Sequence, residues 1–119
     1  MASISELVQL FNTGELGKLL AREFNGERGH VNPNEDSDLL VVFESDASTP
    51  KVGAIAEVVI KHYCQLGYVV SPTINTRDHC FEANISHESG GGFVAVVITT
   101  HYPFNEGHKS LRITSAIIV

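Results

Sequence analysis

The apolar positions change along the chain from a helical spacing to an alternating one. Four residues fall on one face of a first predicted helix: Ile4, Leu7, Val8 and Phe11. Ser3 precedes them and Glu6 follows three residues later, which is the spacing of a capping box. Gly14 ends this helix, and a second one follows with Leu16, Leu19 and Leu20 inward. Gly26 is its predicted C-terminal stop.

The longest helical stripe follows Thr49. Thr49 suits the N-cap and Pro50 suits the first helical position. Six apolar residues then recur at helical spacing: Val52, Ile55, Ala56, Val59, Tyr63 and Leu66. Gly67 closes this helix, the longest of the three that the sequence predicts.

The remaining apolar runs have the length and the period of strands. Before the long helix, Leu39 to Phe43 is unbroken and predicts a strand buried on both faces, after a loop from Glu27 to Asp38. In His79 to His87, Phe81, Ala83 and Ile85 alternate with polar residues. Four further segments complete the pattern: a strand over 68–74, a glycine-rich hairpin turn over 88–92, a central strand over 93–100 and a last strand over 110–119.

The order of these elements predicts an α+β domain. Strands that follow one another with short connections pair antiparallel. We therefore expect an antiparallel or mixed sheet with the one long helix packed on it and the two short N-terminal helices beside it. The 119 residues predict a single domain over 1–119, long enough to fold without disulfides or a structural metal.

Charge and composition narrow the classes of partner. The formal net charge is −6, which disfavours binding to DNA, RNA or an anionic membrane, although a small anion could still bind a few gathered arginines. The N-terminus does not have the form of a signal peptide, and the longest apolar run, Phe93 to Ile98, is far short of the roughly 20 residues of a membrane span. Cys64 and Cys80 lack a CxxC partner and are expected to be free thiols. We predict a cytoplasmic protein.

The catalytic and metal-binding motifs that can be read from sequence are absent. There is no GxGxxG, no GxxxxGK[ST], no GxSxG and no HExxH, and three consecutive glycines, Gly90 to Gly92, lie between two strands, as in a hairpin. We therefore predict no enzymatic activity, no cofactor and no metal. A metal site stays open as an alternative, because distant strands could bring together His79, His87 or His101.

Arginine and one aromatic residue are the candidates for ligand binding. Of the four arginines, Arg28 lies between glycines in a loop, Arg77 begins a strand and Arg112 lies within one. Guanidinium groups bind phosphates through paired hydrogen bonds, whereas the alternative for each arginine is a salt bridge. Phe81 either packs in the core or stacks on a base at a pocket, a contact worth about 1–3 kcal/mol.

The chain resembles a family of phage proteins that block the bacterial Thoeris defence system. The resemblance rests on the short opening helices, the segment 26–33, the helix after Thr49, the strand segment 78–82 and the last strand with Arg112. Members of the family act as sponges that sequester a cyclic ADP-ribose isomer without cleaving it, and some also bind cyclic oligonucleotides. The resemblance implies that Arg28 and Arg112 hold the pyrophosphate and that Phe81 stacks on the adenine. Arg77 is kept as a further candidate ligand residue.

The apolar end of the chain predicts an oligomer, and two alternative functions stay open. The apolar end of the chain, Ala116 to Val119, must lie inside the sheet or against another subunit, and family members form dimers or hexamers. The first alternative function is a small nucleotide hydrolase or isomerase that uses His79, Glu82 or His101 as acid or base. The second is an inhibitor that binds a protein target through the acidic loop around Asp36.

Overall fold

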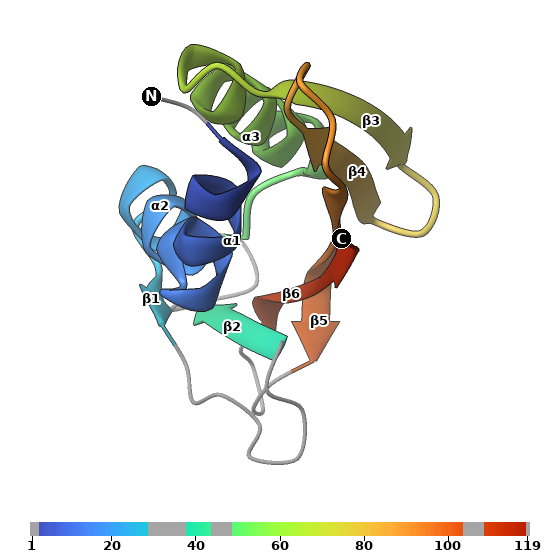
Figure 1. Ribbon diagram of the computed structural model, residues 1–119. Helices are drawn as coiled ribbons and strands as arrows, with labels where there is room; N and C mark the ends of the chain where they lie inside the picture. The colour runs from blue at the N-terminus through green and yellow to red at the C-terminus, as the bar shows by residue number, and fades with distance from the viewer. Residues whose placement is uncertain (1–2, 29–37, 44–48, 104–108, 119) are drawn as a thin grey trace.

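In the part of the chain that it describes, the computed structural model has three helices and six strands, which Figure 1 labels. The structure describes residues 3–28, 38–43, 49–103 and 109–118. The helices are α1 (Ile4–Asn12), α2 (Glu15–Glu23) and α3 (Val52–Gln65). The strands are β1 (Glu27–Arg28), β2 (Asp38–Val42), β3 (Val69–Asn75), β4 (Cys80–Ser86), β5 (Phe93–Pro103) and β6 (Lys109–Ile118).

The strands form one sheet in the order β1-β2-β6-β5-β4-β3. Strands β3 to β6 are neighbours in sequence and in space, as short connections favour. Strand β2 breaks this rule by pairing with β6, and β1 then pairs with β2 at the edge. Every described ladder is antiparallel, which confirms an α+β fold with an antiparallel sheet.

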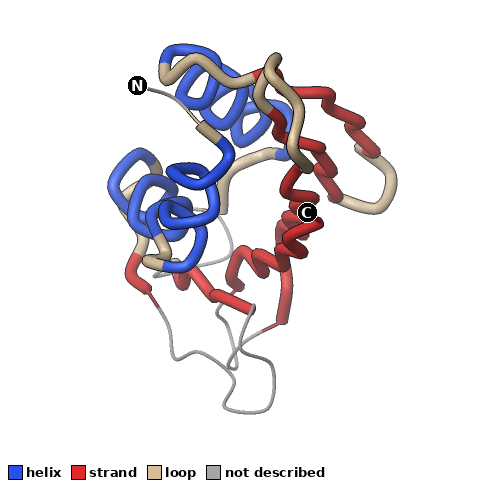
Figure 2. The backbone as a smooth tube through the Cα atoms, viewed as in Figure 1, coloured by secondary structure: helices blue, strands red, loops and turns tan. Residues whose placement is uncertain are grey.

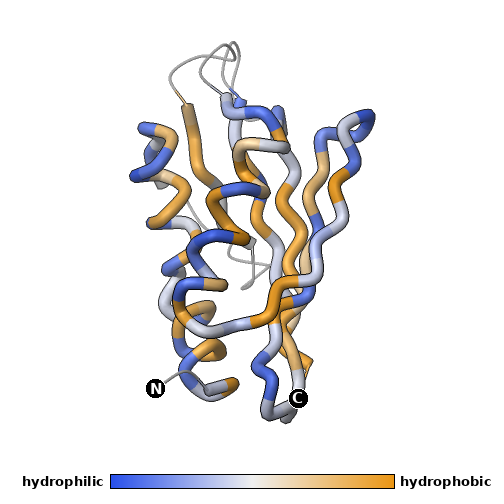
Figure 3. The backbone as a smooth tube through the Cα atoms, turned by 90° about the horizontal axis from the view of Figure 1, so that it is seen from above, coloured by the Kyte–Doolittle hydropathy of each residue, from blue (hydrophilic) through white to orange (hydrophobic). Residues whose placement is uncertain are grey.

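The described helices all lie on one face of the sheet (Figures 1 and 2). Helix α3 packs on β3 and β4, α2 on β1 and β2, and α1 contacts β5. Figure 3, which colours the backbone by hydropathy, shows apolar residues along both the helices and the strands. The core between the layers includes Leu20, Ile55, Phe81 and Ile113, each at most 1% exposed. We call the opposite side of the sheet, which no described helix covers, the outer face.

Ser3 caps the start of α1, and Gly14 stands at the start of α2. The Ser3 side chain accepts a hydrogen bond of 3.1 Å from the backbone amide of Glu6, as the capping spacing predicts. Gly14 has φ 74°, a conformation that glycine adopts without strain, and it links α1 to α2. The predicted end of α1 at Gly14 is therefore confirmed.

The predicted cap of α3 is wrong by two residues. Lys51 occupies the N-cap position, and the Thr49 side chain is buried instead, with 8% exposed. No hydrogen-bond partner for Thr49 Oγ1 is found among the described residues. Thr49 is therefore a buried residue that precedes the helix and does not cap it. The end of α3 agrees with the prediction, since Gly67 follows it with φ 95°.

Gly26 closes the end of α2, as predicted, but the left-handed residue there is Asn25. Asn25 takes the left-handed conformation, with φ 56°, and Gly26 donates its amide to the carbonyl of Ala21 at 2.8 Å. A Cβ at Gly26 would lie 2.8 Å from side-chain atoms of Val41 and Phe43. Glycine is therefore required here by close packing of the chain on β2.

Three strand predictions carry over to the structure. In β4, Phe81, Ala83 and Ile85 are buried, whereas Glu82 and Asn84 are exposed. The three glycines between β4 and β5 all have positive φ, as a tight hairpin requires. Strand β6 lies inside the sheet up to Thr114, its last residue paired with β2. Beyond that point β6 pairs only with β5, and Ile117 and Ile118 are 39% and 47% exposed. Of the two predicted places for the chain end, the inside of the sheet is therefore wrong for residues 116–118.

Candidate functional site

A row of three neighbouring side chains crosses the outer face near one end of the sheet. The ladders pair Cys80 on β4 with Thr99 on β5, and Thr99 with Arg112 on β6. All three residues are half-buried. Paired residues of an antiparallel ladder point to the same face, so a cation, a hydroxyl and a thiol lie side by side here. We call Cys80, Thr99 and Arg112 the polar row.

Strand pairing also brings Arg28 close to Arg112, although they are far apart in sequence. Arg28 pairs with Val41, and Arg112 pairs with the adjacent residue Leu40, on the intervening strand β2. Two strand spacings separate the arginine positions, or about 10 Å. Their registers differ by one residue, which assigns the two positions to opposite faces of the sheet. A ligand on the outer face therefore lies on the side of the Arg112 position and not on that of the Arg28 position.

Arg77 lies apart from this pair of arginines. It is exposed in the turn that joins β3 to β4, and β4 and β5 separate that turn from β6. The turn is held by Asn75 Nδ2, which donates to Asp78 Oδ2 at 2.9 Å, and by the Asp78 amide, which donates to Asn75 Oδ1 at 3.1 Å. Arg77 projects from a defined turn at the same end of the sheet as the polar row.

Phe81 is a core residue, which corrects its predicted role as a stacking ring. It is paired with Ile98, which in turn is paired with Ile113, and all three are at most 1% exposed. With 0% of its surface exposed, the Phe81 ring offers no face to a base. The alternation of β4 is the physical cause, because it places Phe81 on the helix-covered face and Glu82 on the outer face.

Two of the three histidines kept open in the sequence do meet in space. The rings of His79 and His101 have centroids 4.9 Å apart with an interplanar angle of 64°. A β-bulge brings this about, since Thr100 and His101 lie opposite the single residue Leu111. His87 lies elsewhere, with Nδ1 2.6 Å from the hydroxyl of Ser89.

The backbone at this histidine pair is unusual. His79 has φ 52° and His101 has φ 55°, in the left-handed region that costs a non-glycine residue roughly 1 kcal/mol or more. Between them Thr100 is 2% exposed, and its hydroxyl has no hydrogen-bond partner within the described part of the chain. Strain and an unsatisfied buried hydroxyl in one place are features that cluster at functional sites.

The thiol of the polar row is kept in its protonated form by its surroundings. Burial is the main factor that raises the pKa of Cys80, and the carboxylates of Glu82 and Asp78 raise it further. A hydrogen bond with the Thr99 side chain acts in the opposite direction. These surroundings are the reverse of those that activate a nucleophilic cysteine. Cys64 is free and exposed on α3.

Neither a metal centre nor a membrane-spanning helix is found in the described ranges. No group of three or more His, Cys, Asp or Glu side chains there is arranged to hold a metal ion. None of the described helices has both the length and the apolar character needed to cross a membrane. The acidic loop around Asp36 lies outside the described residues.

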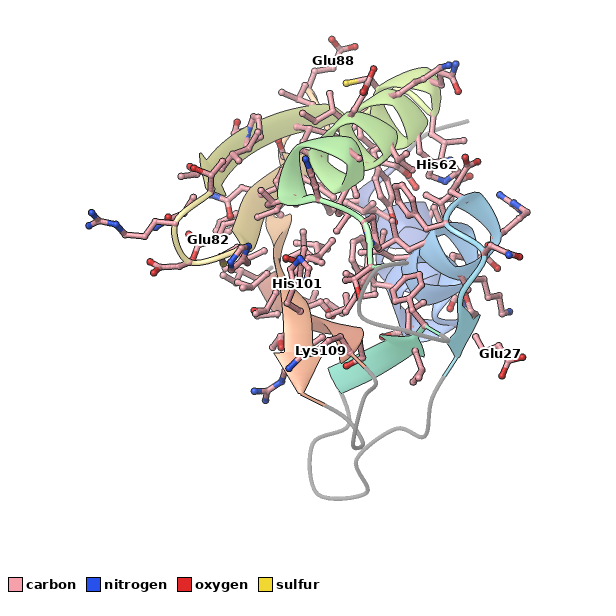
Figure 4. The ribbon with its side chains drawn as sticks, turned by 180° about the vertical axis from the view of Figure 1, so that it is seen from behind. Glu27, His62, Glu82, Glu88, His101 and Lys109 are labelled. Carbon is pink, nitrogen blue, oxygen red and sulfur yellow. The ribbon has the colours of Figure 1, made fainter. Side chains whose placement is uncertain are left out.

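A cavity lies between α2 and α3, on the helix side of the sheet. It has a volume of about 370 Å³, and Figure 4 shows His62 at this position. Its polar lining combines Glu23 and Glu57 with Lys61 and His62. Two carboxylates repel a phosphate, so this groove suits an anionic nucleotide less well than the arginine-bearing outer face.

Arg112 stands out in the sequence as a cation within a predicted strand, whereas its neighbours Cys80 and Thr99 do not. Cys80 and Thr99 become neighbours of Arg112 through the pairing of β4, β5 and β6. A single sequence does not show which residues of different strands pair. Comparisons of the chain with protein-family models, with curated proteins and with solved structures give no match.

Proposed function

We propose that this protein binds and sequesters a cyclic ADP-ribose signalling nucleotide without cleaving it, as a phage anti-defence sponge. The observation that carries the proposal is Arg112, half-buried on the outer face beside the Thr99 hydroxyl. A guanidinium and a hydroxyl at neighbouring positions suit the oxygens of a pyrophosphate. Arg77, at the same end of the sheet, is a further candidate contact.

Local contacts must supply the affinity in this proposal. The net charge of −6 gives no general attraction for a nucleotide anion. A sponge that competes with a receptor needs nanomolar binding, about −12 kcal/mol. Two arginines do not reach that value alone, so a closed pocket that excludes water is required. We propose that a second copy of the chain closes it, in a dimer or a hexamer, in the cytoplasm of the host cell.

Phe81 is fully buried, so another ring has to contact the adenine. Imidazole rings also stack on bases, and the His79–His101 pair lies at the same end of the sheet. These rings replace Phe81 as the proposed base contact. The ligand then spans the sheet end, from Arg112 to the histidine pair.

A direct test mixes the purified protein with a cyclic ADP-ribose isomer and removes the protein by filtration. We expect the ligand to disappear from the filtrate and to return unchanged after heat denaturation of the protein, as chromatography would show. A ligand that stays in the filtrate throughout contradicts nucleotide binding. It would favour an inhibitor that acts on a protein target.

The same experiment tests one other function, which the histidine pair favours. Two imidazoles 4.9 Å apart can serve as acid and base in a hydrolytic reaction. Loss of the ligand together with a new product peak would identify a nucleotide hydrolase. His79→Ala would then abolish the product, whereas Arg112→Ala would weaken substrate binding.

A further inference from the structure

A shallow groove lies on the outer face of the sheet, over β3, β4 and β5. Its walls are formed by six side chains from two cross-strand rows: Ser71, Asn84 and Ala95, and Thr73, Glu82 and Val97. Its floor is formed by the backbone at Ala83 and Val96, whose side chains are buried in the core. The volume is about 190 Å³. We call this feature the outer groove.

The groove continues directly into the polar row. Glu82 is two residues from Cys80 on β4, and Val97 is two residues from Thr99 on β5. Residues two apart on a strand share a face and are separated by about 7 Å. The outer groove and Arg112 are therefore parts of one surface, and a single ligand can extend from one to the other.

The chemistry of the groove is that of a site for hydroxyl groups. Serine and threonine hydroxyls and an amide line it, and each can both donate and accept hydrogen bonds. Glu82 supplies the one charge, and within the described part of the chain its carboxylate has no ion-pair partner. Figure 4 shows Glu82 on β4, away from the helices. Ala95 and Val97 add small apolar surfaces against which a sugar ring can pack.

Size and charge together select one part of a nucleotide. Pockets that hold a whole drug-sized ligand measure about 300–1,000 Å³, so the outer groove fits one ring and not an entire nucleotide. The Glu82 carboxylate repels a phosphate, which Arg112 attracts. A carboxylate can accept hydrogen bonds from two sugar hydroxyls at once, as in the acidic residue that binds ribose in dinucleotide-binding folds.

We infer that the outer groove binds a ribose of the nucleotide and that Glu82 accepts hydrogen bonds from its hydroxyls, an inference that rests on the proposed function. Glu82 is then the specificity residue that separates ribonucleotides from deoxyribonucleotides. Ser71, Thr73 and Asn84 complete the hydrogen bonds around the ring. The phosphate next to this ribose lies at the polar row.

The test compares two ligands on two variants by titration calorimetry. The ligands are cyclic ADP-ribose and its analogue without the 2′-hydroxyls. Hydrogen bonds to charged groups are strong enough that the wild type should prefer the ribose ligand by about tenfold or more. Glu82→Gln should reduce that preference to less than about threefold, by the same principle. Glu82 is exposed, so this change leaves the core intact.

A matched control and a second readout make the outcomes distinct. Glu57→Gln removes one exposed carboxylate from α3, on the other side of the sheet, and should keep the preference. Amide chemical shifts of Ser71, Thr73 and Asn84 should move with the ribose ligand. Binding without a ribose preference, or with one that Glu82→Gln leaves unchanged, overturns this inference but not the proposed function. Absence of binding to both ligands overturns both.

Discussion

The backbone amide of Thr100 donates a 2.8 Å hydrogen bond to the carbonyl oxygen of His79. This bond ties the bulge of β5 to the start of β4, outside the regular ladder that begins at Cys80 and Thr99. The bond holds His79 close to His101, the residue after Thr100, so that the two rings meet. Both histidines have a positive φ. The geometry of this sheet end therefore depends on a backbone contact that any residue type except proline could donate at position 100.

Backbone strain at His79 can be measured with two substitutions. His79→Ala and His79→Gly remove the same ring, but only glycine adopts φ 52° without strain. We expect His79→Gly to be more stable than His79→Ala by about 1 kcal/mol in urea unfolding. Equal stability of the two variants would mean that the backbone relaxes out of the left-handed region.

The buried hydroxyl of Thr100 should reduce stability. Thr100→Val keeps the shape and removes a buried oxygen without a hydrogen-bond partner in the described part of the chain. We expect the free energy of unfolding to rise by about 1 kcal/mol. Thr73→Val, at an exposed position, is the control and should change it much less. A loss of stability in Thr100→Val would indicate that the hydroxyl is satisfied in solution.

Arg112 should control nucleotide affinity. Arg112→Ala removes charge-assisted hydrogen bonds to the phosphates, and we expect cyclic ADP-ribose binding to weaken at least tenfold in calorimetry. Arg112→Lys keeps the charge but loses the planar fork, so it should fall between wild type and alanine. Arg22→Ala, on the exposed side of α2, is the control. Unchanged affinity in a folded Arg112→Ala protein would exclude the polar row as the phosphate site.

The two thiols should differ in reactivity. Burial, Glu82 and Asp78 raise the pKa of Cys80, so its reactive thiolate forms at higher pH than in a free cysteine. Iodoacetamide at pH 8 should therefore modify the exposed Cys64 first, as peptide mass spectrometry can show. Glu82→Gln removes one cause of the shift and should speed alkylation of Cys80 in a Cys64→Ser background. Faster alkylation of Cys80 than of Cys64 would contradict the half-buried position of Cys80 and the raised pKa of its thiol.

Two glycines should respond to alanine in opposite ways. A Cβ at Gly26 would clash with Val41 and Phe43 at 2.8 Å, so Gly26→Ala should destabilise the protein by about 1–3 kcal/mol. A Cβ at Gly53 meets no atom within 4 Å near the start of α3, and Gly53→Ala should stabilise by about 0.5 kcal/mol. Thermal unfolding of both variants measures the contrast. A stable Gly26→Ala protein would show that β2 can move away.

Helices and strands that are specified by their own residue spacing and caps can be predicted from the sequence. The spacing of Ile4, Leu7 and Phe11 with the Ser3 cap predicts α1, and the alternation in β4 determines that Phe81 and Glu82 face opposite ways. That alternation also favoured the core position of Phe81, which the family resemblance had assigned to ligand binding. Periodicity carries such information because it depends on the geometry of one element alone.

Which helices and strands lie side by side is known only from the three-dimensional structure. Backbone hydrogen bonds are alike in every strand, so the ladder itself does not encode that β2 pairs with β6 and brings Arg28 near Arg112. The β5 bulge, which joins His101 to His79, likewise depends on packing across strands. The outer groove exists because three strands align Ser71, Glu82 and Val97 on a face without a described helix.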